Sequence, residues 1–232
     1  MTHKIIRLDE DWPVRIIGPN RRSLTGRITV RGKSIAFESS LERDFLSLLD
    51  FDPVVTEVYG QPVTIQHWIG DQERSYTPDF LVEYDNADRV LYEVKYRENL
   101  WENWSILKPK FRAAIHYSKM NRMRFQIVTE VEIRGTGFLG NVNFLRGYRD
   151  RLSDAAVEEH LIGTLAVLGE TTPEALLTAS YWTQENRMKA ISSLWRLVAI
   201  GRIHADLHLP LTMATPIWVT IGEGFIWQNR HS

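Results

Sequence analysis

The 232-residue sequence contains no cysteine. Disulfide bonds, thiolate zinc sites and a cysteine nucleophile are therefore excluded, and a chain without disulfides suits the reducing cytoplasm, where we expect the protein to act. The sequence also has no apolar run of about 18 residues, the length that a membrane-spanning helix needs. Its first residues, MTHKIIRLDEDW, lack the apolar segment of a secretory signal. We therefore expect no membrane partner.

A strong net charge is absent as well, because 28 Lys and Arg residues nearly balance 29 Asp and Glu residues. The basic residues are nevertheless clustered. The stretches 12–37 and 108–124 each contain six basic residues and no acidic residue. Such clusters can contact the phosphates of a nucleic acid, although a solvated protein surface explains either cluster equally well.

The sequence pattern changes near position 150, so we expect two domains, 1–150 and 151–232. Glycine and proline recur through residues 1–36 and predict an extended arm or loop. The expected elements of the first domain are a helix at about 40–50, strands at about 54–59, 62–69, 74–84 and 89–96, a helix at about 104–120, a strand at about 125–130 and a loop at 135–141. The expected core positions of the second helix are Ile106, Phe111, Ala114, Ile115 and Tyr117. These elements indicate a mixed α/β fold.

The second domain is expected to be mainly helical and small. The predicted elements are helices at about 153–168, 173–181 and 184–200, followed by short strands at 202–207 and 216–221. Three helices followed by a two-stranded ribbon is the order of a winged helix, a variant of the helix-turn-helix. Many small α+β units share this order, so we call the domain winged-helix-like.

One stretch places charge where strands are expected to be apolar. The sequence YTPDFLVEYDNADRVLYEVKYRE, residues 76–98, predicts two strands joined by a turn at 85–89. Asp79 lies in the first strand, and Glu93 and Lys95 lie two residues apart in the second. Side chains alternate along a strand and successive residues rise by about 3.3 Å, so Glu93 and Lys95 share one face about 7 Å apart. An antiparallel hairpin brings Asp79 level with them, and the three groups are expected to converge.

Convergent carboxylates of this kind suit a hard cation. Two carboxylates can hold Mg²⁺, with Mn²⁺ as the expected substitute, while water and a substrate phosphate complete the coordination. The metal lowers the pKa of a bound water, and an adjacent lysine stabilises the transition state. Each feature alone has an ordinary explanation, since an aspartate after proline can cap a turn and a Glu-X-Lys pair can lie on a solvated strand. Their combination within apolar strands favours hydrolysis of a phosphodiester bond.

The residues Pro78-Asp79 followed by Glu93-Val94-Lys95 resemble the PD-(D/E)xK signature of restriction-endonuclease-like nucleases. The expected order of elements is similar to the αβββαβ core of that fold. Longer stretches resemble TnsA, the endonuclease subunit of heteromeric cut-and-paste transposases. They are SSLERDFLSLLDFDPVVTEVYGQPVTI (39–65), YTPDFLVEY (76–84), LYEVKYREN (91–99) and FQIVTEVEI (125–133). The C-terminal part is similar only in type, since that family also carries a winged-helix-like C-terminal domain.

The resemblance implies a role for each matching residue. Asp79 and Glu93 match the metal-binding positions of the strands, and Lys95 matches the strand lysine. Glu42 matches an acidic residue carried by the preceding helix. The three carboxylates are therefore expected to bind the metal, and all four residues are expected to be catalytic. The well-studied family member has glutamine where Glu93 stands, and glutamate is closer to the general nuclease signature. Glu38, four residues before Glu42, is the alternative helix residue, and Glu42 can also be explained as part of a capping box.

Other residues are weaker candidates. Gln61 precedes a strand near the expected site, and its amide can orient a phosphate or a water, although a turn residue is the simpler explanation. Lys110 and Arg112 can contact the DNA backbone, and plain surface charge explains them equally well. His204 and His208 have a spacing that can hold zinc on a helix, but they fall in a strand and its following loop without an evident third ligand.

By resemblance, the expected function is Mg²⁺-dependent cleavage of double-stranded DNA at the 5′ ends of a transposon during excision. The implied partners are a separate DDE-type transposase subunit and an AAA+ regulator that binds through the C-terminal region. The near-neutral charge agrees with specificity borrowed from such partners. Two alternatives stay open: a stand-alone restriction or repair nuclease, and a DNA-binding or adaptor module with a degenerate nuclease core. Charged groups retained among apolar strands argue against the second.

Overall fold

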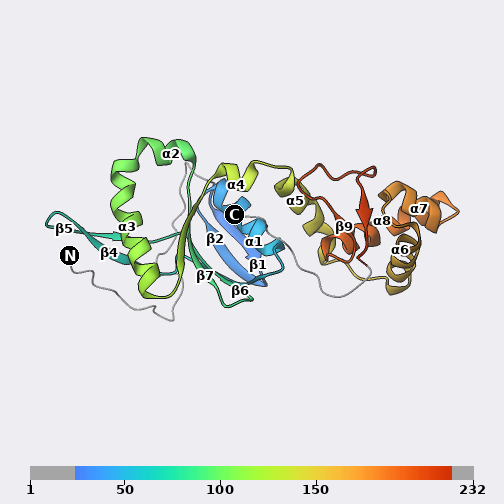
Figure 1. Ribbon diagram of the computed structural model, residues 1–232, viewed down its shortest axis with the longest axis horizontal. Helices are drawn as coiled ribbons and strands as arrows, with labels where there is room; N and C mark the ends of the chain where they lie inside the picture. Colours follow the sequence, from blue (N-terminus) through green and yellow to red (C-terminus); the bar gives the residue numbers. More distant parts are fainter. Residues whose placement is uncertain (1–23, 221–232) are drawn as a thin grey trace. The chain divides into compact units, whose positions relative to one another are not determined.

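The computed structural model describes residues 24–220. Two compact units can be distinguished, one ending at Leu139 and the other beginning at Gly140 (Figure 1). The first unit contains the stretches that are expected to carry the site, and the second contains the mainly helical C-terminal part. Residues 1–23, most of the predicted N-terminal arm, lie outside the described range.

A four-stranded sheet in the order β3-β6-β7-β8 forms the centre of the first unit. Its strands are β3 (Val55–Gly60), β6 (Phe80–Tyr84), β7 (Arg89–Val94) and β8 (Arg124–Val128). The strands β3, β6 and β7 pair antiparallel, and β6 and β7 form the predicted hairpin. β8 pairs parallel with β7, which requires a crossover connection. The helices α2 (Arg97–Glu102) and α3 (Trp104–Met120) supply that connection.

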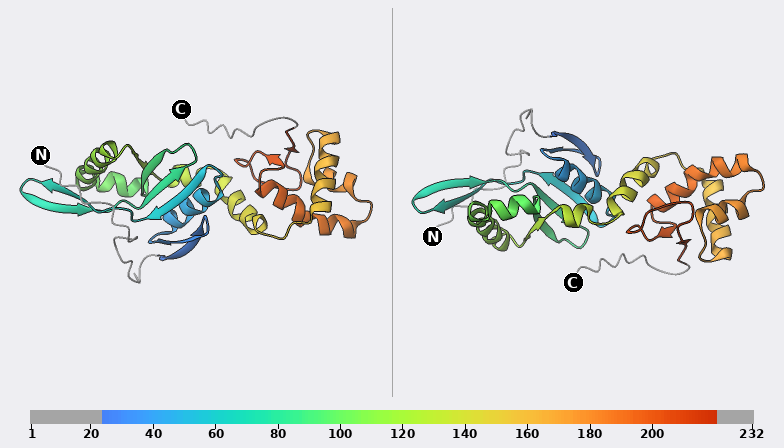
Figure 2. Two further views of the ribbon diagram at one scale, coloured as in Figure 1. Left: turned by 90° about the horizontal axis from the view of Figure 1, so that it is seen from below. Right: turned by 90° about the horizontal axis from the view of Figure 1, so that it is seen from above.

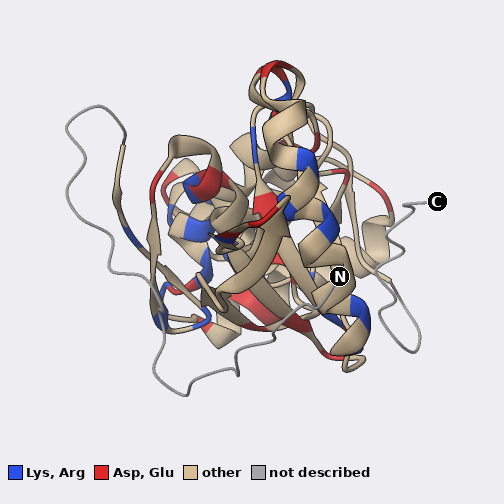
Figure 3. Ribbon diagram, turned by 90° about the vertical axis from the view of Figure 1, so that its left-hand side faces the viewer, with Lys and Arg blue, Asp and Glu red and all other residues tan. Residues whose placement is uncertain are grey.

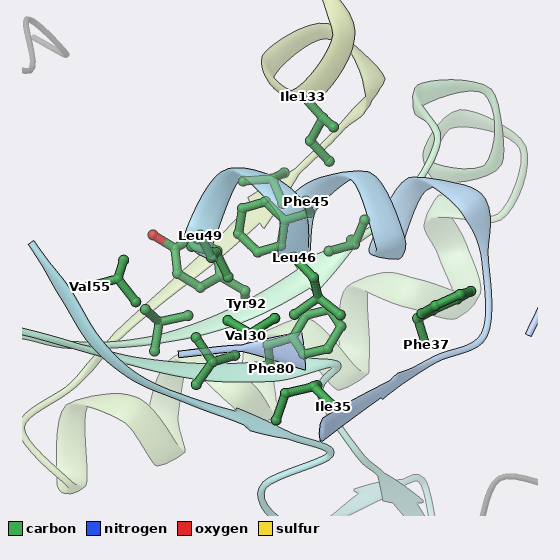
Figure 4. Close-up of a cluster of buried hydrophobic side chains, with 14 of the residues drawn as sticks. Val30, Ile35, Phe37, Phe45, Leu46, Leu49, Val55, Phe80, Tyr92 and Ile133 are labelled. Carbon is green, nitrogen blue, oxygen red and sulfur yellow. The ribbon is translucent and has the colours of Figure 1, made fainter. Parts of the chain in front are cut away.

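The helix α1 (Ser40–Phe51) covers one face of this sheet (Figure 4). Its apolar residues recur at helical spacing, so Phe45 and Leu46 point to the same side and enter the core. The ring centroids of Phe45 and Tyr92 of β7 lie 5.0 Å apart. Burial of each large apolar side chain stabilises the fold by roughly 1.5–3 kcal/mol, and this packing fixes the position of α1 on the sheet. The first turn of α1, which carries Glu42, is thereby positioned as well.

The helix α3 covers the opposite face of the sheet. Its buried residues are Leu107, Phe111, Ala113, Ala114, Tyr117 and Ser118. They belong to the same cluster as Leu81 of β6 and Leu91 of β7. The sequence predicts Ile106 and Ile115 as core residues, but their side chains are 69% and 42% exposed. The prediction was wrong for these two because Leu107, Phe111 and Ala114 form the face that meets the sheet, and Ile106 and Ile115 lie to either side of it.

The hairpin of β1 (Gly26–Val30) and β2 (Lys33–Phe37) also packs on the α1 side of the sheet. The prediction of an irregular arm was therefore wrong for these residues. Arg31 and Gly32 do not break the structure but form its turn, with φ angles of 48° and 78°. Two successive residues with positive φ make the turn that matches the twist of hairpin strands.

The strands β4 (Ile65–Ile69) and β5 (Gln72–Tyr76) form a separate two-stranded ribbon that extends from the sheet (Figure 2). The sequence predicts one strand over residues 74–84, but the structure divides it into β5 and β6. Pro78 explains the division because it has no N–H to donate to a neighbouring strand. Pro78 and Asp79 thus lie between the ribbon and the sheet.

The second unit, taken by itself, is mainly helical. Its elements are α5 (Phe138–Arg149), which begins at the end of the first unit, α6 (Ala155–Leu168), α7 (Pro173–Ser180), α8 (Gln184–Ala199), β9 (His204–Ala205) and β10 (Ile217–Trp218). β9 and β10 pair antiparallel and follow α6, α7 and α8 in the predicted order, with α5 as an additional helix before them. The winged-helix designation stays a prediction. His204 and His208 take part in no metal-binding group within residues 24–220. In the same range, no helix is both long enough and apolar enough to cross a membrane.

The helix α5 replaces the end of the predicted loop at 135–141 and belongs mostly to the second unit. The side-chain Nδ2 of Asn141 donates to the carbonyl oxygens of Leu207 and Leu209 at 2.8 and 2.7 Å. Phe144 meets Trp195 of α8 edge-on, with ring centroids 5.3 Å apart. These contacts explain why the second unit begins at Gly140 rather than after residue 150.

The short helix α4 (Glu130–Arg134) follows β8 and closes the α1 side of the first unit. Thr129 and Glu132 form a capping box at its start. Ile133 of α4 is buried in the same core cluster as Phe45 and Leu46 of α1 (Figure 4). Arg134 reaches Asp44 of α1, with 2.6 Å between guanidinium and carboxylate, and so ties the two helices together.

Candidate active site

Asp79 lies directly before β6, where the hairpin register brings it beside Glu93 of β7. Phe80 pairs with Tyr92, so the residue before Phe80 lies opposite the residue after Tyr92. The N–H of Asp79 donates to the Tyr92 carbonyl at 3.1 Å. Its carboxylate Oδ2 accepts a hydrogen bond from the N–H of Val94 at 2.7 Å. Hydrogen bonds with the backbone of β7 therefore hold both the main chain and the carboxylate of Asp79 in place.

Glu93 is the residue around which the other charged groups gather. Its side chain is only 1% exposed, and its Oε1 lies 3.2 Å from Nζ of Lys95. Its Oε2 accepts a 2.6 Å hydrogen bond from the hydroxyl of Tyr76, at the end of β5. Nζ of Lys110, on α3, lies 3.7 Å from Oε1. A buried carboxylate is tolerated when charges and hydrogen bonds replace its water, and here three elements provide them.

Glu42 is buried in the first turn of α1. Its Oε2 accepts from the backbone N–H of Glu38 at 2.7 Å, and its Oε1 accepts from the hydroxyl of Ser39 at 3.0 Å. Ser39 in turn accepts from the N–H of Glu42 at 3.1 Å and caps the helix. The same carboxylate interacts electrostatically with Asp79 and Lys95. Glu42 therefore serves the helix cap and faces the candidate site at once.

Burial is the main cause of raised pKa values at two of the carboxylates, Asp79 and Glu42. Burial, and then the neighbouring charge of Glu93, raise the pKa of Asp79 well above its usual value, although Lys95 opposes this. Burial likewise raises the pKa of Glu42. Burial by itself lowers the pKa of Lys95, but the charges of Asp79 and Glu93 outweigh burial, and the pKa of Lys95 is raised. Lys95 is thus held as a cation, whereas burial lowers the pKa of Lys110.

The charge of the site fits a divalent cation. When all five groups are ionised, three carboxylates and two ammonium groups leave one negative charge in a largely buried place. Carboxylate oxygens are also the donors that Mg²⁺ and Mn²⁺ prefer. Among residues 24–220, however, no three Asp, Glu or His side chains are arranged to hold a metal ion. Lys95 and Lys110 lie on the Oε1 side of Glu93. The carboxylates therefore suit the ion in charge and chemistry, and the lysines compete with it for Glu93.

Tyr76 and Lys110 belong to this cluster, although sequence reasoning did not place them there. The sequence offers Lys110 only as a contact for the DNA backbone, one of several basic residues along α3 (Figure 3). The structure instead holds its Nζ 4.9 Å from the ring centroid of Tyr76. No sequence signal reveals this contact, because it depends on how α3 packs across the sheet. Tyr76 does have a signal, since it begins the YTPD stretch that contains Asp79. Arg112, the other predicted backbone contact, is exposed and outside the cluster.

Gln61 supports the segment that carries Asp79. Its backbone N–H donates to the Asp79 carbonyl at 2.8 Å, and its Nε2 donates to Oε1 of Glu38 at 3.3 Å. Its φ of 49° is uncommon for a residue other than glycine. Its buried Oε1 has no hydrogen-bond partner among the described atoms. Gln61 thus connects the end of β3 to Asp79 and to Glu38. Glu38, the alternative acidic residue, contacts the cluster through its backbone N–H, which donates to Glu42.

Comparison with known families bears on the same part of the chain. Residues 52–130 match the family model described as TnsA-like endonuclease N terminal. The matched segment contains Asp79, Glu93 and Lys95, and Glu42 lies before it. The match confirms the resemblance found in the sequence, and the mixed α/β first unit is consistent with a restriction-endonuclease-like fold. None of the curated proteins matches the chain.

Proposed function

We propose that the protein is the Mg²⁺-dependent endonuclease subunit of a heteromeric transposase, because residues 52–130 match the TnsA-like endonuclease family model. It hydrolyses phosphodiester bonds of double-stranded DNA at the 5′ ends of a transposon during excision. The observation that carries this proposal is the convergence of Asp79, Glu93 and Lys95 at one end of the β6–β7 hairpin. The more general conclusion, that the protein is a nuclease of the transposase type without a stated metal or DNA strand, rests on the family match alone.

The carboxylates and the lysine of the site have different roles in the proposed hydrolysis. Asp79 and Glu93, with Glu42 beside them, would hold Mg²⁺ or Mn²⁺, which supplies an activated water and neutralises phosphate charge when bound. Lys95 is held as a cation and stabilises the negative charge that develops on the phosphate during hydrolysis. The hydrogen bonds from Val94 to Asp79 and from Tyr76 to Glu93 keep the two carboxylates in place without using Lys95.

The proposed partners follow from the family rather than from any contact in the structure. A TnsA-like domain implies that the protein acts on DNA together with other transposase subunits. We propose that these subunits are a DDE-type transposase and an AAA+ regulator, and that the regulator binds through the second unit. The formal net charge of −1 supports this arrangement, because a protein that finds one DNA end unaided is usually more basic. The partners then supply the sequence specificity.

The decisive variant is Asp79→Asn, which removes a charge and keeps an acceptor for the N–H of Val94. In a reconstituted reaction with DNA ends, partner subunits and Mg²⁺, 5′-strand cleavage should fall at least about 1000-fold. Asp85→Ala, on the exposed turn of the same hairpin, is the matched control and should cleave normally. Full activity of Asp79→Asn would refute the proposal. Specific cleavage by the wild-type chain without partners would instead identify a stand-alone nuclease.

A further inference from the structure

Lys110 is surplus to what Glu93 needs for its own stability. The two carboxylate oxygens already have partners, since Oε1 lies 3.2 Å from Lys95 and Oε2 accepts the 2.6 Å hydrogen bond of Tyr76. Lys110 approaches Oε1 only to 3.7 Å, the longest of the three contacts. Partial burial of an ammonium group costs free energy, so a third partner for one carboxylate calls for a further explanation.

Apart from the 3.7 Å contact with Glu93, two aromatic ring faces hold the ammonium group of Lys110. Nζ lies 4.9 Å from the ring centroid of Tyr76 and 5.6 Å from that of Phe111. Ring faces attract a cation without accepting its N–H groups in fixed directions. The side chain is 24% exposed, close to the 29% of Lys95, so both lysines reach the accessible side of the cluster. The ammonium group is thus oriented and available to an anion.

The charges of the whole site also call for a second cation. Glu42, Asp79 and Glu93 carry three negative charges, and a divalent ion with Lys95 offsets all three. A phosphodiester then adds one more negative charge, which Lys110 balances. Without Lys110 the anionic substrate would enter a buried site that is already neutral.

We propose that Lys110 is a second active-site cation that binds a non-bridging oxygen of the scissile phosphate. This inference rests on the proposed nuclease function. It assigns Lys110 to the substrate rather than to the metal or to the DNA backbone at large. Lys110 leaves the weak contact with Glu93 when the phosphate arrives, and the ring of Tyr76 keeps its Nζ near the site in both states.

The test compares Lys110→Met and Lys110→Arg with a control on the same helix. Lys119→Met removes the same charge at the C-terminal end of α3. This end lies near the start of β7, since the side chain of Arg89 donates to the carbonyl of Asn121, whereas Glu93 lies near the end of β7. Two readouts are measured for each protein: the single-turnover rate of cleavage of an end duplex, and the salt dependence of its affinity for that duplex. The affinity is measured in EDTA, once with a normal scissile phosphate and once with a neutral methylphosphonate in its place.

Lys110→Met should slow cleavage about 100-fold, Lys110→Arg should retain a rate within about tenfold of wild type, and Lys119→Met should match wild type. The salt slope is the slope of log affinity against log salt concentration. For the wild type, replacing the scissile phosphate with methylphosphonate should reduce the size of this slope by about 0.9, and for Lys110→Met it should leave the slope unchanged. Mn²⁺ binding measured by calorimetry should not weaken in Lys110→Met. A wild-type cleavage rate for Lys110→Met, a methylphosphonate effect that persists in it, or weakened Mn²⁺ binding would each overturn the inference.

The two proposals fail in different ways. If Asp79→Asn cleaves DNA normally, the nuclease site itself is misassigned. If Asp79→Asn is inactive while Lys110→Met behaves as wild type, only the role of Lys110 is wrong. The salt-slope comparison needs no cleavage and tests the phosphate contact separately.

Discussion

Glu93 shows how a single buried charge depends on its hydrogen bonds. Tyr76→Phe would remove the hydroxyl that donates to Oε2 and leave that oxygen unpaired inside the protein. We expect the free energy of unfolding to fall by about 1–3 kcal/mol, measured by urea titration. The cleavage rate should fall as well, because the carboxylate loses one of its two fixed contacts.

Tyr84→Phe is the matched control for that substitution. Its hydroxyl lies 2.8 Å from the hydroxyl of Tyr92, so the same chemical change there removes a bond between neutral groups. The loss should be smaller, about 1 kcal/mol, and cleavage should be unaffected. Equal losses of stability and activity in the two variants would show that Tyr76 has no special relation to Glu93.

The raised pKa of Asp79 makes a prediction about stability and pH. A carboxyl group with a higher pKa in the folded than in the unfolded state binds more protons when folded, so stability falls as pH rises between the two values. In EDTA, the wild-type protein should therefore lose stability as pH rises above the ordinary range of an aspartate. Asp79→Asn should show a flatter dependence across the same range, and urea titrations at several pH values measure both. A steeper or identical dependence in the variant contradicts the assignment.

Much of the site at the residue level could be predicted from the sequence. Asp79, Glu93 and Lys95 lie on one hairpin, where alternation and register follow from local pairing alone. Tyr76 and Lys110 could not be predicted as contacts of Glu93, because β5 bends away from β6 and α3 lies in a different layer. Their positions depend on packing between elements that no local pattern encodes.

At the scale of elements, the cap of α1 links helix stability to the site. Ser39→Ala would remove the cap of Glu42 N–H and the hydrogen bond to Glu42 Oε1. We expect a loss of about 1 kcal/mol in unfolding free energy and slower cleavage, because the Glu42 carboxylate loses one of its two partners.

Thr183→Ala tests whether that loss of activity comes from the site. Thr183 caps α8 in the second unit by accepting from the N–H of Asn186 at 3.3 Å. Its removal should cost a similar amount of stability, about 1 kcal/mol, and leave the intrinsic rate of cleavage unchanged. If both variants slow cleavage equally, the effect of Ser39 reflects general destabilisation and not Glu42.

The elements themselves were predictable where periodicity is long and regular. The helices α1, α3, α6 and α8 follow the sequence pattern closely, as does the β6–β7 hairpin. The β1–β2 hairpin was missed because glycine is common both in irregular segments and in tight turns. The sequence alone does not show that Arg31 and Gly32 form a hairpin turn. The helix α5 was missed because Gly140 and Gly147 weaken its helical pattern, and contacts such as those of Asn141 decide its conformation instead.

At the scale of the whole molecule, each unit has its own buried core. Leu46 of α1 and Leu165 of α6 are both 0% exposed. Leu46→Ala should destabilise the first unit by about 2–5 kcal/mol, and Leu165→Ala should do the same to the second. Calorimetry of the full chain should show two transitions, each lowered by only one of the variants. A single transition that both variants shift equally would show that the units unfold together.

The parallel pairing of β7 with β8 sets the order in which the protein can assemble during synthesis. The hairpin that carries Asp79 and Glu93 needs only local contacts, whereas β8 and Lys110 arrive later along the chain. Contacts between distant residues form slowly because a long loop must close first. A nascent chain that ends at β7 therefore carries the carboxylates with neither α3 nor its second lysine in place. The proposed site is therefore complete only after α3 and β8 have left the ribosome and folded.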